Sequence, residues 1–178
     1  MLKPRILVAA AMMLIAAATR LFPHPANFAP IAAIALFGGA TLYDKRLAFG
    51  VPLLAMLLSD ALIGFHDTMP FVYGSFALIV CIGMMLRTRR GLLPLAGAAL
   101  TSSILFFVIT NFGVWTAGSI YPKSFPGLVA CYVAAVPFFQ NTLFGDAVYT
   151  AALFGGLAIA EARFPMLRTQ EPKPLGQQ

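Results

Sequence analysis

The sequence predicts an all-α integral membrane protein built as a bundle of six transmembrane helices. Hydrophobic residues make up 60% of the 178 residues and charged residues only 10%, with a mean hydropathy of +0.87. A soluble domain would be nearer half apolar, whereas a chain that lies mostly in lipid has this composition. Six apolar segments follow one another along the chain, and the basic residues divide unequally between the alternate turns that join them.

The six apolar segments are residues 6–21, 28–42, 47–65, 71–86, 92–117 and 127–162. The second ends at the charged turn "YDKR", residues 43–46, and the fourth at "RTRR", residues 87–90. The sixth is longer than the ~20 residues that a span needs, and Pro137 and the polar pair "QN" at 140–141 interrupt it. It is therefore either a short surface helix followed by a span or one kinked helix.

These segments predict a single transmembrane domain over residues 1–165. The remaining residues, 166–178, form a polar tail that contains two prolines and few apolar side chains. Such a segment cannot bury enough apolar surface to order itself, so we expect it to be disordered.

The basic residues predict the orientation of the bundle. If both termini are cytoplasmic, ten of the twelve Lys and Arg residues lie on the inner side, and only Arg20 and Lys123 lie outside. This is the positive-inside pattern of a multi-pass protein, here expected in the bacterial cytoplasmic membrane with residues 66–70 and 118–126 facing outward. The basic residues stand between apolar runs rather than on one face, so the partner they indicate is the lipid bilayer and not nucleic acid.

The first segment leaves two questions open. Three consecutive alanines, residues 9–11, recur seven positions later at residues 16–18. Small side chains on a helix let another membrane helix approach closely, so they form either a docking face for another membrane protein or ordinary packing within the bundle. Residues 1–20, with two basic residues, a short apolar run and "AAAT" at 16–19, also fit a cleavable signal peptide, which would leave five spans in the same orientation.

The outer end carries most of the varied polar and aromatic chemistry of the chain. The stretch "LLSDALIGFHDTMPFVYGSF", residues 57–76, places Asp60, His66 and Asp67 within eight positions of one another. We expect His66 and Asp67 at the outer turn after the third segment and Asp60 about two helical turns further inside. "PHPAN" and "TNFGVWTAGSIYPKSFPG" fall on the same side, whereas the inner turns are plain basic loops. This asymmetry indicates a cavity that is open to the outside.

Several polar residues lie inside apolar segments, where each needs a reason. An ionisable side chain at mid-span costs ~2.5–3.5 kcal/mol or more and normally faces the bundle interior or a wet cavity. Asp60 either orients a substrate or is structural, in which case it caps a neighbouring helix or pairs with Arg20. Asp146 is either a site residue or forms a hydrogen bond that supports packing. The Trp and Tyr residues also suit an interfacial aromatic belt. The predicted substrate-binding residues are Asp60, His66, Asp67, Tyr73, Asn111, Trp115, Tyr121, Tyr132, Gln140, Asn141 and Asp146.

The sequence contains no catalytic or metal-binding motif. HExxH, GxSxG, Walker A and CxxC patterns are all absent. Cys81 and Cys131 lie fifty positions apart in apolar runs, without the spacing of a metal site or a disulfide framework. His66 and Asp67 are adjacent at a turn, where solvation explains them better than acid–base chemistry. We therefore predict a protein that is not an enzyme and that has no cofactor and no bound metal.

The blocks "NFAPIAAIALFGGA", "LLSDALIGFHDTMPFVYGSF", "TNFGVWTAGSIYP", "GLVACYVAAVPFF" and "GDAVYT…LFG", most of residues 27–156, resemble an uncharacterised bacterial family of predicted membrane transport proteins. More distantly, the chain is similar to the S components of energy-coupling-factor transporters. That resemblance implies an S-component-like bundle that binds a vitamin or metal ion at its outer face and topples against a coupling subunit docked on the first helix. Solitary cobalamin transporters of this type can use a cysteine as cobalt ligand, but here neither cysteine matches a ligand motif.

The leading hypothesis is a substrate-binding membrane transport protein that takes up a small water-soluble molecule, such as a vitamin, through the outward cavity. One alternative is a small membrane enzyme that uses His66, Asp67 and Asp60 on a lipid-linked substrate at the outer surface. Another is a structural or assembly subunit without a ligand. The expected partners are the bilayer, the small molecule and a coupling membrane subunit on the first helix.

Overall fold

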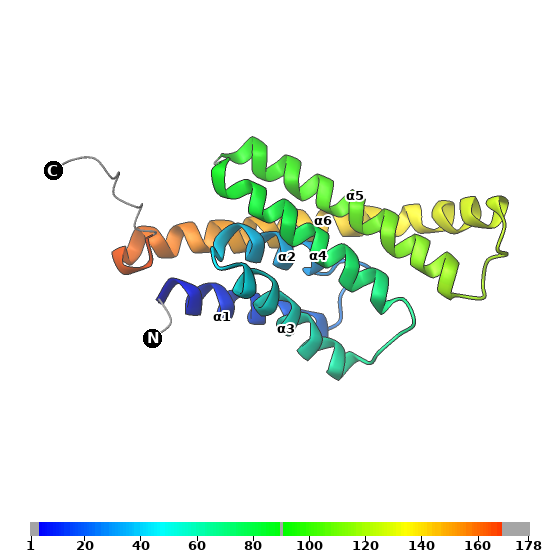
Figure 1. Cartoon of the computed structure of the whole chain (residues 1–178), viewed down its shortest axis with the longest axis horizontal. Coiled ribbons are helices and arrows are strands. Elements are labelled where there is room, and N and C mark those ends of the chain that lie inside the picture. Colours follow the sequence, from blue (N-terminus) through cyan, green and yellow to red (C-terminus); the bar gives the residue numbers. More distant parts are fainter. Residues whose placement is uncertain (1–3, 90, 169–178) are drawn as a thin grey trace.

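The computed structural model describes residues 4–89 and 91–168, and these residues form helices joined by short loops, without a strand. The α-helices are α1 (Pro4–Ala18), α2 (Ile31–Thr41), α3 (Lys45–Ile63), α4 (Met69–Met85), α5 (Leu92–Ala117) and α6 (Phe125–Arg163), as Figure 1 shows. Three 3₁₀ turns extend them: η1 (Thr19–Leu21), η2 (Leu86–Thr88) and η3 (Pro165–Leu167). The predicted all-α fold is confirmed.

Five of the helices are long and apolar enough to cross a membrane, and α2 is not. With 11 residues, α2 is roughly 16 Å long, about half of the ~30 Å hydrocarbon core. The predicted span over residues 28–42 is therefore not confirmed, because the helix there covers only Ile31–Thr41. Pro30, directly before the helix, explains its late start, because proline lacks an N–H and disfavours helical backbone in the residue before it.

The short helix α2 lies at the centre of the bundle. It packs against all five other helices, and its residues from Ala32 to Gly39 are all buried. Small residues allow this placement: a Cβ atom on Gly39 would lie 2.1 Å from the Val80 carbonyl oxygen of α4, and one on Gly83 would lie 2.3 Å from the Leu36 carbonyl oxygen. The α2 and α4 backbones therefore touch at a glycine pair, as small residues permit in membrane helix packing.

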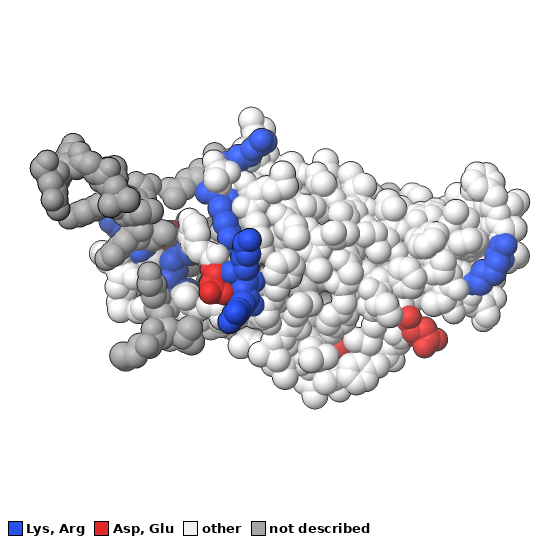
Figure 2. Space-filling view, in the orientation of Figure 1, with Lys and Arg blue, Asp and Glu red and all other residues white. Residues whose placement is uncertain are grey.

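Successive helices run in opposite directions, so the start of α1, the end of α6 and the two basic turns lie at one end of the bundle (Figure 1). Figure 2 shows Lys and Arg side chains gathered at that end and a broad uncharged surface beyond it. We call this the basic end, and the end that carries the turns at 64–68 and 118–124 the opposite end. The arrangement is that of a multi-pass membrane protein.

The sixth segment forms one continuous helix of 39 residues with Pro137 inside it. The alternative of a surface helix followed by a separate span is therefore wrong. At the opposite end Ser124 caps this helix by accepting a hydrogen bond from the Gly127 N–H at 3.3 Å. After it, η3 follows directly and Leu167 is buried, so the predicted disordered tail does not begin at residue 166. The rest of that prediction, residues 169–178, lies outside the described residues.

Helix α1 packs into the bundle through its alanines. Ala9, Ala16 and Ala17 are buried in the core, together with Met13, which is fully buried. Packing within the bundle therefore explains half of the alanine repeat, and among the repeated alanines only Ala11 and Ala18 are exposed.

Candidate functional site

The carboxyl end of α2 lies inside the bundle, where arginines satisfy its carbonyl groups. Arg87 donates from Nε to the Gly39 oxygen at 2.8 Å and from its guanidinium to the Leu42 oxygen. Arg5 donates to the Thr41 oxygen at 2.6 Å and pairs with Glu161 at 2.8 Å. The last carbonyls of a helix have no partners within it, and the cationic groups also offset the negative end of the helix dipole.

The amino end of α2 faces a carboxylate from α6. The Asp146 side chain is 3% exposed and lies near the backbone N–H of Ala33, in the first turn of α2. The Ser103 hydroxyl of α5 donates to Asp146 Oδ2 at 2.6 Å. A carboxylate at a helix amino terminus is favourable because the free N–H groups and the dipole are positive there.

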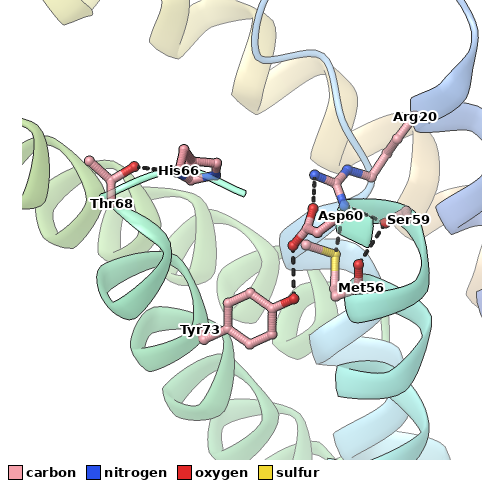
Figure 3. Close-up of polar contacts among 7 residues, drawn as sticks. All are labelled: Arg20, Met56, Ser59, Asp60, His66, Thr68 and Tyr73. Carbon is pink, nitrogen blue, oxygen red and sulfur yellow. Dashed lines mark hydrogen bonds and ion pairs between the residues drawn. The ribbon is translucent and has the colours of Figure 1, made fainter. Parts of the chain in front are cut away.

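Asp60 forms a buried ion pair with Arg20, as Figure 3 shows. The Arg20 guanidinium lies 2.7 Å from Asp60 Oδ1, and the Tyr73 hydroxyl donates to Oδ2 at 2.8 Å. The Asp60 side chain is 3% exposed and that of Arg20 11%. Arg20 also donates to the Ser59 hydroxyl at 2.5 Å. Both carboxylate oxygens of Asp60 thus have partners within the protein, which is the pairing that the structural alternative predicted.

A cavity of about 370 Å³ opens beside these groups, in the half of the bundle away from the basic end. We call it the outer cavity; it lies beside the amino end of α2. Its apolar lining comes mainly from the start of α2, from α5, from the end of α3 and from the start of α4. Its volume falls within the ~300–1,000 Å³ of small-molecule sites, which combine apolar walls with a few polar groups. The polar lining residues are Arg20, His24, Asn27, Thr110, Asn111, Thr142 and Asp146.

Two of the eleven predicted site residues, Asn111 and Asp146, line the outer cavity. The Asn111 side-chain amide donates to the Phe107 carbonyl at 2.8 Å, which fixes its orientation. Asp60 and Tyr73 do not line the cavity. Asp60 contacts the cavity residue Arg20, and Tyr73 contacts Asp60. We expected Asp60 to line the cavity itself, and it is not among the lining residues.

The other predicted residues lie apart from the cavity. His66 and Asp67 are exposed on the turn before α4, where His66 bonds the Thr68 hydroxyl at 2.8 Å (Figure 3). His66 thus has a partner on its own turn, whereas Asp60 is buried in its ion pair. The structure does not bring the three residues of the enzyme hypothesis together at one site.

Three aromatic residues and two amides complete the predicted set. Trp115 donates to the Pro122 carbonyl at 2.9 Å, and Lys123 lies 5.8 Å from its ring. Tyr132 donates to the Val108 carbonyl at 2.6 Å, and Asn141 to that of Ala26 at 2.9 Å. Of the remaining two, Tyr121 is partly exposed in the loop before α6 and Gln140 is exposed on α6. None of the five lines the outer cavity.

Five polar residues that line the cavity were missing from the predicted set: Arg20, His24, Asn27, Thr110 and Thr142. Two of them belong to "PHPAN", which the sequence did mark as a polar cluster on the outer side. Asn27 also has a φ of 62°, a left-handed conformation that Asn tolerates better than most residues. Thr142 carries no sequence signal, because a threonine in an apolar helix usually bonds its own backbone. Thr110 is the first residue of the cluster "TNFGVWTAGSIYPKSFPG" but was not predicted as a site residue.

A larger cavity, of about 550 Å³, lies at the basic end. Three of its four arginines already have partners: Arg5 and Arg87 bond the end of α2, and Arg168 donates to the Glu161 carbonyl at 3.0 Å. Because these groups close a helix end, we assign the candidate site to the outer cavity. Within the described residues no group of three or more His, Cys, Asp or Glu side chains lies together as a metal site would require.

Five apolar helices, a buried half-length helix and a polar cavity at one end define a multi-pass helical membrane protein. The chain belongs to DUF6580, a family of unknown function, whose sequence profile matches residues 1–167. No curated protein and no solved structure shows significant similarity to it.

Proposed function

We propose that this protein is a membrane transport protein that binds a small water-soluble molecule, such as a vitamin, in the outer cavity. The observation that carries the proposal is the cavity itself: about 370 Å³, with polar side chains from η1, the 22–30 segment, α5 and α6 around one space. Polar groups that converge from separate elements inside an apolar bundle are typical of a substrate pathway.

The proposal includes the orientation. Seven of the nine described Lys and Arg residues lie at or near the basic end, and the other two, Arg20 and Lys123, lie toward the opposite end. The positive-inside rule supports a basic end that faces the cytoplasm, so we propose that the protein lies in the bacterial cytoplasmic membrane with the cavity open to the outside. Single cysteines at Thr68 and Thr88, in a chain without Cys81 and Cys131, test this. An impermeant reagent on intact cells should label the first and not the second, and the reverse result would contradict the orientation.

The S-component-like coupling is part of the same proposal. A coupling subunit that docks on α1 would meet the exposed Ala11 and Ala18, since Ala9, Ala16 and Ala17 are already covered by the bundle. Replacing Ala18 with Trp should then lower uptake without lowering the affinity for the transported molecule. Equal uptake by the variant and the wild type would remove this face from the interaction.

The binding step is tested by thermal stability. A ligand that binds the folded state raises the melting temperature by mass action, so a library of water-soluble metabolites is screened against the purified protein in detergent. Asn111→Ala should weaken binding of the metabolite found by ~10-fold or more, the loss expected when a fixed polar contact is removed. Gln140→Ala, outside the cavity on α6, is the matched control and should bind normally.

Uptake into proteoliposomes then separates transport from the other hypotheses. Accumulation of the unchanged metabolite supports the proposal. Conversion of the metabolite without accumulation would favour the enzyme, and equal binding by Asn111→Ala and wild type would place the ligand outside this cavity.

A further inference from the structure

Three oxygen-bearing side chains follow one face of α6 at intervals of four residues. Thr142, Asp146 and Thr150 are 9%, 3% and 6% exposed, and residues four apart lie one above the other on a helix. Thr142 and Asp146 line the outer cavity. Asp146 and Thr150, together with Ser103, line a separate groove of about 290 Å³ between α5 and α6. Asp146 is thus the residue that the two spaces share.

Thr150 differs from the other hydroxyl residues of these helices. Thr101, Ser102, Thr110 and Thr142 each donate to the carbonyl four residues earlier, at 2.7–3.3 Å. The Thr150 hydroxyl is buried and has no hydrogen-bond partner in the part of the chain that the structure describes. A buried hydroxyl is normally satisfied, so a group that occupies the groove is the natural partner for this oxygen.

Asp146 has no cationic partner within the described residues. The two ion pairs found there are Arg5–Glu161 and Arg20–Asp60, and both leave Asp146 out. Buried carboxylates are normally paired or bound to a cation. The amino end of α2 offsets part of the charge on Asp146 but supplies no full positive charge.

We propose that Asp146, Ser103 and Thr150 bind one small monovalent cation, with sodium as the probe. All three donors are oxygen atoms, and one carboxylate balances one positive charge. Ser103 has a single hydrogen but two acceptors, the Ala99 carbonyl at 3.1 Å and Asp146 Oδ2 at 2.6 Å. When it donates to Ala99, its lone pairs and the carboxylate both face the groove as ligands.

The affinity should be modest, because the positive end of α2 lies against the same carboxylate. This inference goes beyond the proposed uptake of a small molecule and does not depend on it. The site can be saturated in the absence of any substrate, so its test is separate from the metabolite screen.

The test is a melting curve of the purified full-length protein in which sodium chloride replaces choline chloride at constant ionic strength. The wild type should show a saturable rise in melting temperature with sodium, as expected for a ligand of the folded state. Asp146→Asn should abolish the rise. Thr150→Val should increase the half-saturating sodium concentration ~10-fold, in line with the loss of one contact at a metal site.

Thr150→Val also separates binding from packing. Because it removes a hydroxyl without a protein partner, the variant should melt in choline chloride at the same temperature as the wild type or higher. If Thr150 were purely structural, Thr150→Val would change the melting temperature in choline chloride and leave the sodium-dependent rise unchanged. That result would exclude Thr150 from the site. Thr101→Val, at an exposed position on α5, is the matched control and should keep the full sodium response.

Identical curves in sodium and choline for the wild type would overturn the proposal, as would a full sodium response in Asp146→Asn. Should Asp146→Asn not fold, Ser103→Ala and Thr150→Val decide the question, because a normal sodium response in both leaves the cation without its ligands.

Discussion

Replacing Arg20 with methionine tests whether the Arg20–Asp60 pair is structural. The substitution keeps an apolar chain of similar length but leaves the Asp60 carboxylate, 3% exposed, with the Tyr73 hydroxyl as its one recorded partner. Breaking a buried pair by removing one partner costs ~3–5 kcal/mol, since the remaining charge is uncompensated. We expect a loss of this size in the free energy of unfolding, which would take a large part of the stability of a typical domain.

The reverse substitution, Asp60→Asn, should cost less. It leaves Arg20 beside the outer cavity, where water reaches it, and with its hydrogen bond to the Ser59 hydroxyl intact. The loss is then about that of one hydrogen bond to a charged group, ~1.5–3 kcal/mol. In the double variant no charge is left unpaired, so its loss should be smaller than the sum of the two single losses by ~2 kcal/mol or more, within the range of coupled neighbours.

Unfolding is followed in mixed micelles with increasing SDS, using the fluorescence of Trp115, the single tryptophan of the chain. Arg46→Met, at an exposed position in the first turn of α3, is the control and should change stability by no more than ~0.5 kcal/mol. If Arg20→Met is no more costly than this control, or if the two single losses simply add, then the ion pair does not hold the bundle together. If Asp60→Asn has normal stability but binds the ligand more weakly, then Asp60 is a binding residue, as the sequence analysis predicted.

Two further substitutions test the packing of α2. Gly83→Ala places a methyl group against the Leu36 carbonyl and should destabilise the protein by ~1–3 kcal/mol, as overpacking does. The control in the same unfolding assay is Gly97→Ala, whose added methyl group would meet open space; it should be neutral or slightly stabilising. Equal effects would show that α2 and α4 do not touch at this glycine. Arg87→Met removes donors to three carbonyls at the end of α2 and should cost ~2–4 kcal/mol, whereas the exposed Arg89 should tolerate the same change; comparable losses for the two arginines would contradict the capping role.

The fold class and the arrangement of the helix ends could be predicted from the sequence, because both depend on composition. Apolar segment lengths located five of the helices closely, and the basic turns mark one end of the bundle. The length of α2 could not be predicted from hydropathy, since residues 28–42 are apolar throughout. Apolar character shows that a segment is buried, but not whether the segment is helical over its whole length.

The site was harder to predict than the fold. The sequence identified polar residues within apolar segments as exceptional, and Asp60, Asn111 and Asp146 do lie at or beside the outer cavity. It could not separate a residue that lines a space from one that satisfies a neighbour. Asp60 and Arg20 stand forty positions apart, and only the packing of η1 against α3 shows that each neutralises the other.

The scarce charges inside this bundle are explained largely by the shortness of α2. A short helix packed inside the bundle leaves backbone groups unpaired at both of its ends, and these groups need partners from the rest of the protein. Arg5 and Arg87 supply donors at one end and Asp146 supplies an acceptor at the other.

The same shortness makes room for the cavity. Pro30 delays the start of α2 to Ile31, so the place that a full-length helix would fill is bordered instead by the irregular 22–30 segment. Irregular backbone at this depth is tolerated where it is buried in protein or lines a wet space, and Asn27 and Ala29 of this segment do line the outer cavity. The residue that caps α2, Asp146, therefore also faces the cavity that the short helix creates. Structural and binding roles meet at that carboxylate because one feature of the sequence, a proline-rich start to the second apolar segment, produces both the unpaired helix end and the space in front of it.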